Sequence, residues 1–162
     1  MQALETVLAS LARAPSLVHE LVAEMPPDLR TRRLRPEKWS LHEHACHLLV
    51  AQELFEQRLD RMLSEDNPEI GPYLPHEYDP PDLLLQMDLD ASLRELQERR
   101  ERLVARLRRL ALAEWQRSAR HPEYARYTIY IMFRHLALHD QFHMYRMEEL
   151  LLEPSFFAGR NA

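Results

Sequence analysis

Hydrophobic residues recur at helical spacing in four long segments of the chain. In residues 2–25, 40–64, 90–113 and 128–152, apolar side chains return every three or four positions and therefore share one face of a helix. Most of the 11 prolines lie between these segments, and there are only two glycines. This punctuation is typical of helices with stiff connections and disfavours a sheet with many turns. The pattern predicts an all-α protein, a four-helix bundle.

The starts of two segments carry capping signals. Ser40 followed three residues later by Glu43 is a capping-box pattern, which predicts the first residue of the second helix. Asp88 or Asp90 supplies an N-cap for the third helix.

Prolines mark the limits of the first and last segments. Pro26 and Pro27 end the first helix, and Pro154 ends the last. Pro15 lies within the first segment and should kink or divide that helix. In the third segment, the run of arginine and glutamate at residues 98–102 is typical of a solvated helix face.

Three of the nine histidines are candidates for one metal site. His139 and His143 are four residues apart and therefore share a face of the last helix. His47 lies on the second helix. Neutral imidazole is the commonest protein ligand for a divalent metal, and three protein ligands leave coordination positions open for chemistry.

The heights of these histidines along their helices favour one bundle topology. His47 lies about 10 Å from the start of its helix, and His143 about 13 Å from the end of its own, at 1.5 Å per residue. The three rings are level if the second and fourth helices are antiparallel. This predicts an up-down-down-up order with a long crossover between helices 2 and 3. The proline-rich residues 65–89 are long enough to form it.

A heptad reading of the last segment places both histidines where leucine is usual in a bundle core. The predicted core-facing positions are Ile129, Met132, Leu136, His139, His143, Arg146 and Leu150. A buried imidazole without a hydrogen-bond partner costs about 1–3 kcal/mol, and a bound metal removes that cost. The alternative is that each ring bonds a carbonyl or tyrosine, or lies on the surface.

Neighbouring residues are weaker candidates. His135 points roughly 80° away from His143 around the helix and is expected in an outer shell or at the surface. His44 is the substitute for His47, and either His44 or His135 could close the site as a fourth ligand. Cys46 is expected to be a small buried hydrophobe. Tyr130, Arg134, Glu53 and Arg146 are candidates for a pocket wall.

Other metal and nucleotide motifs are absent from the sequence. His42 and His47 flank a zinc-protease-like stretch, but their spacing of five cannot chelate one metal from a regular helix face. Di-iron bundles require Glu-x-x-His on two helices, and this pattern does not occur. No phosphate-binding glycine loop or nucleophile elbow is present.

Composition limits the number of domains, the partners and the cellular compartment that we expect. The 162 residues predict a single domain, residues 1–162. The net charge of −5 gives no basic footprint for nucleic acid. The single cysteine excludes an internal disulfide, and we see no targeting signal or membrane-spanning run. We therefore expect a cytoplasmic protein that binds neither nucleic acid nor membrane.

Two motifs resemble the DinB-like superfamily, bacterial proteins with a DNA-damage-inducible namesake and relatives among thiol transferases. Trp39-Ser40-Leu41-His42-Glu43, followed by His47-Leu48, resembles the W-S-x-x-E…H-L signature, and residues 139–143 resemble its H-[DE]-x-x-H element. The resemblance covers most of the chain. It implies an up-down-down-up bundle, often dimeric, with zinc or nickel bound by three histidines. The matching positions are His47, His139 and His143.

The chain departs from the family pattern at two places. Val50 stands where relatives often have aspartate, and Arg146-Met147 where they often have Gln-Ile. These changes leave the ligands in place but give no support to an inherited substrate.

Two functional hypotheses follow. The first is a metal-dependent enzyme of the thiol transferase or hydrolase type, using Zn²⁺ or Ni²⁺ and acting on a small molecule such as a low-molecular-weight thiol. The alternative is a non-catalytic metal-binding stress-response bundle. A homodimer is expected from the resemblance.

Overall fold

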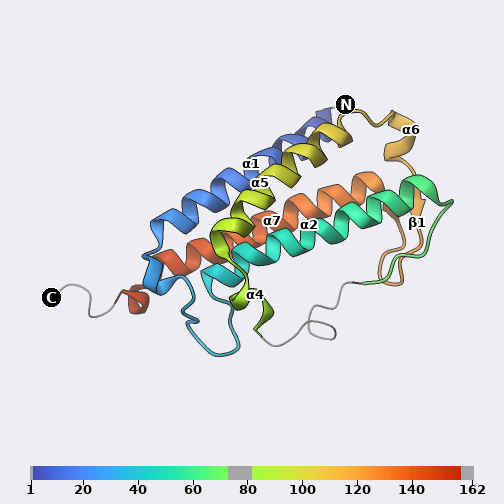
Figure 1. Ribbon diagram of the computed structural model, residues 1–162. Helices are drawn as coiled ribbons and strands as arrows, with labels where there is room; N and C mark the ends of the chain where they lie inside the picture. The colour runs from blue at the N-terminus through green and yellow to red at the C-terminus, as the bar shows by residue number, and fades with distance from the viewer. Residues whose placement is uncertain (1, 73–81, 158–162) are drawn as a thin grey trace.

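Four long helices pack side by side along the whole molecule (Figure 1). They are α1 (Gln2–Glu24), α2 (Leu41–Ser64), α5 (Leu89–Leu107) and α7 (Ile129–Leu152). In this computed structural model, α1 and α2 each pack against both α5 and α7, so the helices form the corners of a square. The structure describes residues 2–72 and 82–157. The four-helix bundle predicted from the hydrophobic pattern is confirmed.

Contacts between the helices define their directions. On α2 and α5, Gln52 meets Arg100 and Asp60 meets Arg106, so these two helices are parallel. On α2 and α7, Phe55 packs against Phe133 and His44 meets His143, so they are antiparallel (the same order is seen in Figure 1). The remaining pair, α1 and α5, is antiparallel, because Leu11 meets Arg100 and Glu5 meets Arg108. The order is therefore up-down-down-up, as predicted.

The connection between α2 and α5 must span the bundle. Because α2 and α5 are parallel neighbours, the chain leaves one end of the bundle after Ser64 and re-enters at the other end at Leu89. A short helix, α4 (Leu83–Gln86), precedes α5. Of the prolines predicted to form the crossover, Pro75, Pro80 and Pro81 lie outside the described residues.

The helix starts follow their capping signals. Ser40 caps α2 in a complete capping box with Glu43, and Asp88 caps α5. Thr128 caps α7 through a hydrogen bond to the backbone N–H of Ile131. These contacts satisfy backbone donors that the first helical turn leaves without partners. The Ser40 and Thr128 caps fix where the histidine-bearing helices α2 and α7 begin.

The core consists of two hydrophobic clusters separated by a buried polar layer. One cluster contains Leu11, Leu59 and Phe133, and the other contains Val18, Leu41, Leu96 and Met147. Between them lie Gln52, Arg100 and Asp140, each 1% exposed or less. Three of the four helices thus place a polar residue at the middle of the bundle.

Pro15 was expected to kink or divide the first helix, and α1 continues through Pro15 as one helix, so the second of these alternatives is wrong. Proline has no N–H to donate to the carbonyl four residues earlier, which belongs to Leu11. Arg100 of α5 donates to that carbonyl instead, at 3.1 Å. The lost helical hydrogen bond is replaced from a neighbouring helix, and the helix is maintained.

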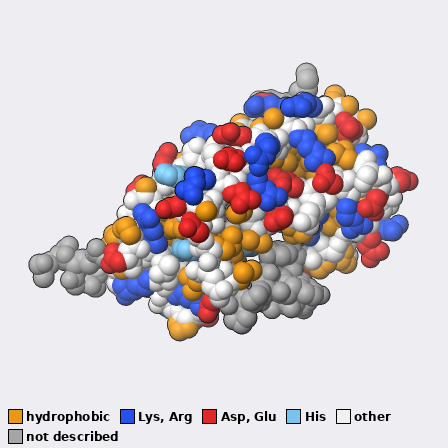
Figure 2. Space-filling model, viewed as in Figure 1, with side chains coloured by type: hydrophobic (Ala, Val, Ile, Leu, Met, Phe, Trp, Pro, Cys, Tyr) orange, Lys and Arg blue, Asp and Glu red, His pale blue; other side chains and the backbone are white. Residues whose placement is uncertain are grey.

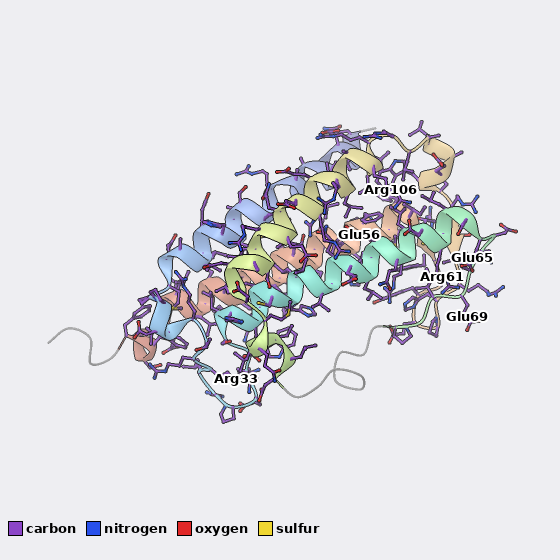
Figure 3. All side chains as sticks on the ribbon, viewed as in Figure 1. Arg33, Glu56, Arg61, Glu65, Glu69 and Arg106 are labelled. Atoms are coloured by element: carbon purple, nitrogen blue, oxygen red, sulfur yellow. The ribbon has the colours of Figure 1, made fainter. Side chains whose placement is uncertain are left out.

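The face formed by α2 and α5 carries interspersed acidic and basic side chains (Figure 2). Arg99 bonds Glu56 at 2.7 Å and Arg106 bonds Asp60 at 2.6 Å, across the two helices (Glu56 and Arg106 are labelled in Figure 3). The predicted solvated face of residues 98–102 is therefore correct in part. It is wrong for Arg100, which is 1% exposed.

The third helix ends earlier than predicted. α5 stops at Leu107 rather than at residue 113, and a separate turn, α6 (Leu112–Trp115), follows. The change of direction buries Trp115 against Phe133. Packing of this indole therefore overrides the helical propensity of residues 108–113.

A two-stranded ribbon then leads into the last helix. β1 (Ser118–Ala119) pairs antiparallel with β2 (Tyr127–Thr128), which the sequence pattern did not predict. Two 3-10 turns, η1 (Pro27–Leu29) and η2 (Pro154–Phe156), follow α1 and α7. No helix in the described residues is long and apolar enough to cross a membrane.

Candidate metal centre

His47, His139 and His143 meet between α2 and α7. The Nε2 atoms of His47 and His139 are 3.1 Å apart, and the Nε2 atoms of His143 and His139 are also 3.1 Å apart. One nitrogen from each ring lies within 4.8 Å of the other two. Among the described residues, these three form the only such group of potential metal ligands. The structure thus brings together the three side chains selected from the sequence.

The spacing of these nitrogens fits a shared divalent ion. Nitrogen binds such an ion at 2.0–2.1 Å, so two ligands are separated by roughly 2.9–3.4 Å for angles from a right angle to the tetrahedral value. Two of the three separations lie in this range, and one nitrogen of each ring lies within 4.8 Å of the other two.

Hydrogen bonding among the rings does not account for the arrangement equally well. The Nε2 of a neutral imidazole carries either one proton or one lone pair. His139 Nε2 faces two other Nε2 atoms and can make one linear hydrogen bond to only one of them. A cation at the meeting point satisfies all three lone pairs.

Burial keeps the rings in the state that binds metal. Desolvation lowers the pKa of His47 to about 3 and of His143 to about 2, with the neighbouring rings adding to the effect. Both imidazoles are therefore neutral near pH 7, and neutral imidazole is the ligand form.

His44 supports the site from behind rather than joining it. Its Nδ1 lies 2.9 Å from the Nδ1 of His143, on the opposite side of that ring from the Nε2 that faces the trio. If His143 ligates through Nε2, its proton is on Nδ1, and His44 accepts it through a lone pair. Such outer hydrogen bonds orient metal-binding histidines. The hypothesis that His44 is a fourth ligand receives no support.

His135 is also outside the trio. Its side chain is exposed and packs near Phe55 and Tyr124, at ring-centroid distances of 6.3 and 6.0 Å. This agrees with the sequence prediction of a surface or outer position. Cys46 is fully buried, as predicted for a small hydrophobe.

Trp39 lies against the histidines because of the helix cap that follows it. Its ring centroid is 4.8 Å from that of His47, and it stacks on His143 at 5.7 Å with an interplanar angle of 20°. Glu43 accepts hydrogen bonds from the Ser40 backbone and hydroxyl, and from Arg33. The glutamate of the W-S-x-x-E pattern is thus a capping residue, held from the preceding loop by Arg33 (labelled in Figure 3).

A buried ion pair lies next to His139. Arg100 donates to Asp140 at 2.6 Å and to the side-chain oxygen of Gln52 at 2.7 Å. The other Asp140 oxygen, Oδ1, is 4.0 Å from His139 Nδ1, and neither atom has a hydrogen-bond partner within the described chain. Nδ1 of a ring that ligates through Nε2 carries a proton, so the carboxylate faces the correct side of His139 to attract it.

Two hollows adjoin the trio. A cavity of about 220 Å³ includes His139 in its wall, and its other residues come from α2, the segment after α2, the loop before β2, β2 and α7. A wider groove of about 660 Å³ lies on the other side, against Trp39, His44 and His143. A small molecule can therefore reach the site from two directions.

The predicted pocket residues are only partly placed at these hollows. Arg146 lines the groove, but it is half-exposed and pairs with Glu149, so its predicted core-facing position is wrong. The long Arg146 side chain reaches solvent, and the next residue, Met147, occupies the core instead. Glu53 pairs with Arg99, and Tyr130 packs under Arg134; none of these lines either hollow.

Sequence reasoning missed Arg100 and Gln52 beside the site, and also Arg58, which lines the cavity next to His139. Arg100 is hidden in a charged run, and Gln52 is one polar residue in an amphipathic helix. Pro15 was the available signal for Arg100, since its missing N–H leaves one carbonyl for a donor from another helix.

A sequence model of the DinB superfamily matches residues 10–147. The chain belongs to the DinB superfamily. As a DinB protein it has the predicted trio on the predicted helices, and the matched region includes all three histidines. The family resemblance inferred from the two motifs is confirmed.

Comparison of structures supports the same fold. YfiT from Bacillus subtilis, described as a probable metal-dependent hydrolase with an unusual four-helix bundle topology, superposes with a TM-score of 0.81. The two chains are 23% identical, and the match covers 91% of this chain and 85% of YfiT. Among proteins with curated functions, none matches.

Proposed function

We propose that this DinB protein is a metal-dependent enzyme of the hydrolase or thiol transferase type. Its metal, Zn²⁺ or Ni²⁺, is held by His47, His139 and His143. The observation that carries the proposal is the convergence of the Nε2 atoms, with two separations of 3.1 Å. The description of YfiT as a probable metal-dependent hydrolase supports the hydrolase form.

The composition of the site favours catalysis over a purely structural metal. Structural zinc sites are closed by four protein ligands, whereas catalytic sites keep a position open. The trio is joined by no fourth histidine, cysteine or carboxylate among the described residues. A divalent ion in such a site activates water or a thiol at neutral pH.

The surrounding side chains perform defined tasks in this proposal. Trp39 covers one flank of the trio, and His44 holds the Nδ1 side of His143. Asp140 attracts the Nδ1 proton of His139, and Arg100 holds that carboxylate in place. Three of these neighbours, His44, Asp140 and Arg100, are themselves buried, and Trp39 is half-buried.

The first experiment is elemental analysis of protein purified without an affinity tag. About one zinc or nickel ion per chain is expected. Anomalous diffraction should place the ion between α2 and α7. Protein that binds no metal at neutral pH after incubation with either ion would refute the proposal.

A second experiment separates an enzyme from a metal-binding stress-response bundle. Metal-loaded protein is assayed with ester and amide substrates, and with low-molecular-weight thiols plus an electrophilic acceptor. Turnover that needs the ion supports the enzyme. Full metal occupancy without any turnover favours the non-catalytic alternative. Dimerisation and a cytoplasmic location stay predictions from the sequence.

A further inference from the structure

The cavity beside His139 combines flat rings with one guanidinium. Its volume of about 220 Å³ is below the roughly 300–1,000 Å³ of pockets that hold drug-sized ligands. Its occupant is therefore a small molecule, or the reacting end of a larger one. The rings and the cation in its wall are Phe55, Tyr124, Tyr127, His121, His135 and Arg58.

The rings pack on one another and form a continuous aromatic wall. Tyr124 and Tyr127 are stacked at 5.9 Å with an interplanar angle of 9°. His121 packs against both, at ring-centroid distances of 4.5 and 4.9 Å. His135 joins Tyr124 to Phe55 across the cavity. Such a wall favours a flat ligand, because planar groups stack on aromatic rings.

Arg58 has donors to spare. One terminal nitrogen donates to the Tyr127 hydroxyl at 3.2 Å and the other to the Gly71 carbonyl at 2.8 Å, while the guanidinium lies over the Phe55 ring. A guanidinium has five N–H donors, so three have no partner among the described residues. No carboxylate pairs with Arg58 in the described part of the chain. Its charge is therefore available to an anion.

Among the described residues that line the cavity, only Glu123 carries a carboxylate. Glu123 is exposed, whereas Arg58 is half-buried. Solvent screens an exposed charge more strongly than a buried one, so the guanidinium dominates inside the cavity.

The cavity adjoins the most exposed of the three histidines. His139 has 22% of its side chain exposed and forms part of the cavity wall. On the opposite flank, the groove meets Trp39 and the Nδ1 side of His143, where His44 is already bonded. A molecule in the cavity thus lies against the trio without displacing any of these contacts.

We propose that this cavity is the substrate pocket of the metal centre and that it takes a small planar anion. Arg58 binds the anionic group, and the tyrosine and histidine rings stack on the flat part. The inference rests on the proposed function, because the pocket holds a substrate only if the protein is an enzyme. The anion-binding site itself can be tested separately.

The test uses benzoate as a planar anion and benzamide as its neutral counterpart. Binding to zinc-loaded and metal-free protein is followed by NMR titration, including the ring signals of His135 and His139. We expect benzoate to bind about tenfold more tightly than benzamide, as one charge-assisted contact predicts. The His135 and His139 signals should shift. Equal binding of the two compounds by the wild type would overturn the inference without any variant.

Two matched variants locate the anion. Arg58→Met keeps the aliphatic stem and removes the charge, so it should abolish the preference for benzoate. Lys38→Met removes a cation from the groove on the opposite flank and should leave the preference unchanged. Preference that survives Arg58→Met, or that is lost in Lys38→Met, would overturn the inference. Melting temperatures show whether each variant is folded.

The metal-free arm separates the two proposals. If the protein binds no zinc but shows an Arg58-dependent preference for benzoate, the anion site stands and the metal-dependent function fails. If zinc binds stoichiometrically and the preference does not depend on Arg58, the function stands and this pocket assignment fails.

Discussion

Two buried polar groups lie side by side in this bundle and are satisfied in different ways. In the central layer, the Arg100 donors meet oxygens of Asp140, Gln52 and Leu11. In the histidine trio, three Nε2 atoms point at one another. The Arg100 guanidinium is satisfied by protein oxygens, and within the described chain Asp140 Oδ1 is left without a partner beside His139. In the trio, His139 Nε2 faces two other nitrogens at once, an arrangement that a shared cation satisfies. Burial alone therefore does not mark a functional site; the atoms left to be satisfied do.

The largest expected effect comes from breaking the central layer. Arg100→Met leaves Asp140 as a buried charge without a partner, which should lower the free energy of unfolding by about 3–5 kcal/mol. Urea unfolding measures this. Arg102→Met, an exposed neighbour paired with Glu98 at 3.8 Å, should cost less than about 1 kcal/mol.

A double variant tests whether the unpaired charge of Asp140 causes this loss of stability. Arg100→Met with Asp140→Leu removes both charges and should be more stable than Arg100→Met alone, because no unpaired charge remains. A double variant less stable than the single one would show that the ion pair is not the reason for the loss.

The next largest effect is expected when a metal-binding histidine is removed. His143→Ala should lower metal affinity by more than the roughly 10–100-fold that loss of an outer hydrogen-bond partner costs. Elemental analysis after dialysis should show metal well below one ion per chain. His135→Ala is the matched control from the same helix and should keep its metal. Equal metal content in His143→Ala and the wild type would remove His143 from the site.

A smaller effect is expected for the residue behind the ligand. His44→Leu removes the acceptor for His143 Nδ1 and should weaken metal binding by about 10–100-fold. His44→Gln keeps an acceptor oxygen and should recover part of that loss. Competition titrations with a chelating dye measure both. Identical affinity in wild type and His44→Leu would show that His44 only fills space.

The smallest effect for each histidine ring is the change of folding stability with pH. His44, His47 and His143 have pKa values lowered by burial to about 4, 3 and 2, so each is neutral when folded but takes up a proton below about pH 6.5 when unfolded. Stability of the metal-free protein is therefore complete above pH 6.5 and falls as pH decreases. Between pH 6.5 and 5.5 the loss should be about 1 kcal/mol per ring.

Acid should also release the metal, since the rings must be neutral to bind it. In the folded chain the pKa values of His47 and His143 are about 3 and 2, so we expect the ion to be kept at pH 5 while the bundle is folded and to be lost when stronger acid protonates these rings or unfolds the chain. Dialysis at a series of pH values, followed by elemental analysis and a folding check, measures this, and release at pH 6 from a chain that is still folded would contradict it.

The sequence alone was sufficient for the existence of the four long helices, for their order and for the choice of the three histidines that meet. Ser40 and Thr128 specify where α2 and α7 begin, because a capping hydroxyl acts within one helical turn. The i, i+4 spacing then places His139 and His143 on one face, and the equal heights of the histidines selected the correct topology. All of these follow from the local geometry of a helix.

Only the tertiary structure decided the fate of the long side chains. Arg100 and Arg146 both occur on helices with regular patterns, yet Arg100 is buried and Arg146 reaches solvent. The partners that bury Arg100 come from α1, α2 and α7, distant in sequence. The helical period gives the direction in which a side chain leaves the backbone. Whether a flexible charged side chain finds a buried partner depends on which helices are its neighbours, and that is a property of the assembled bundle.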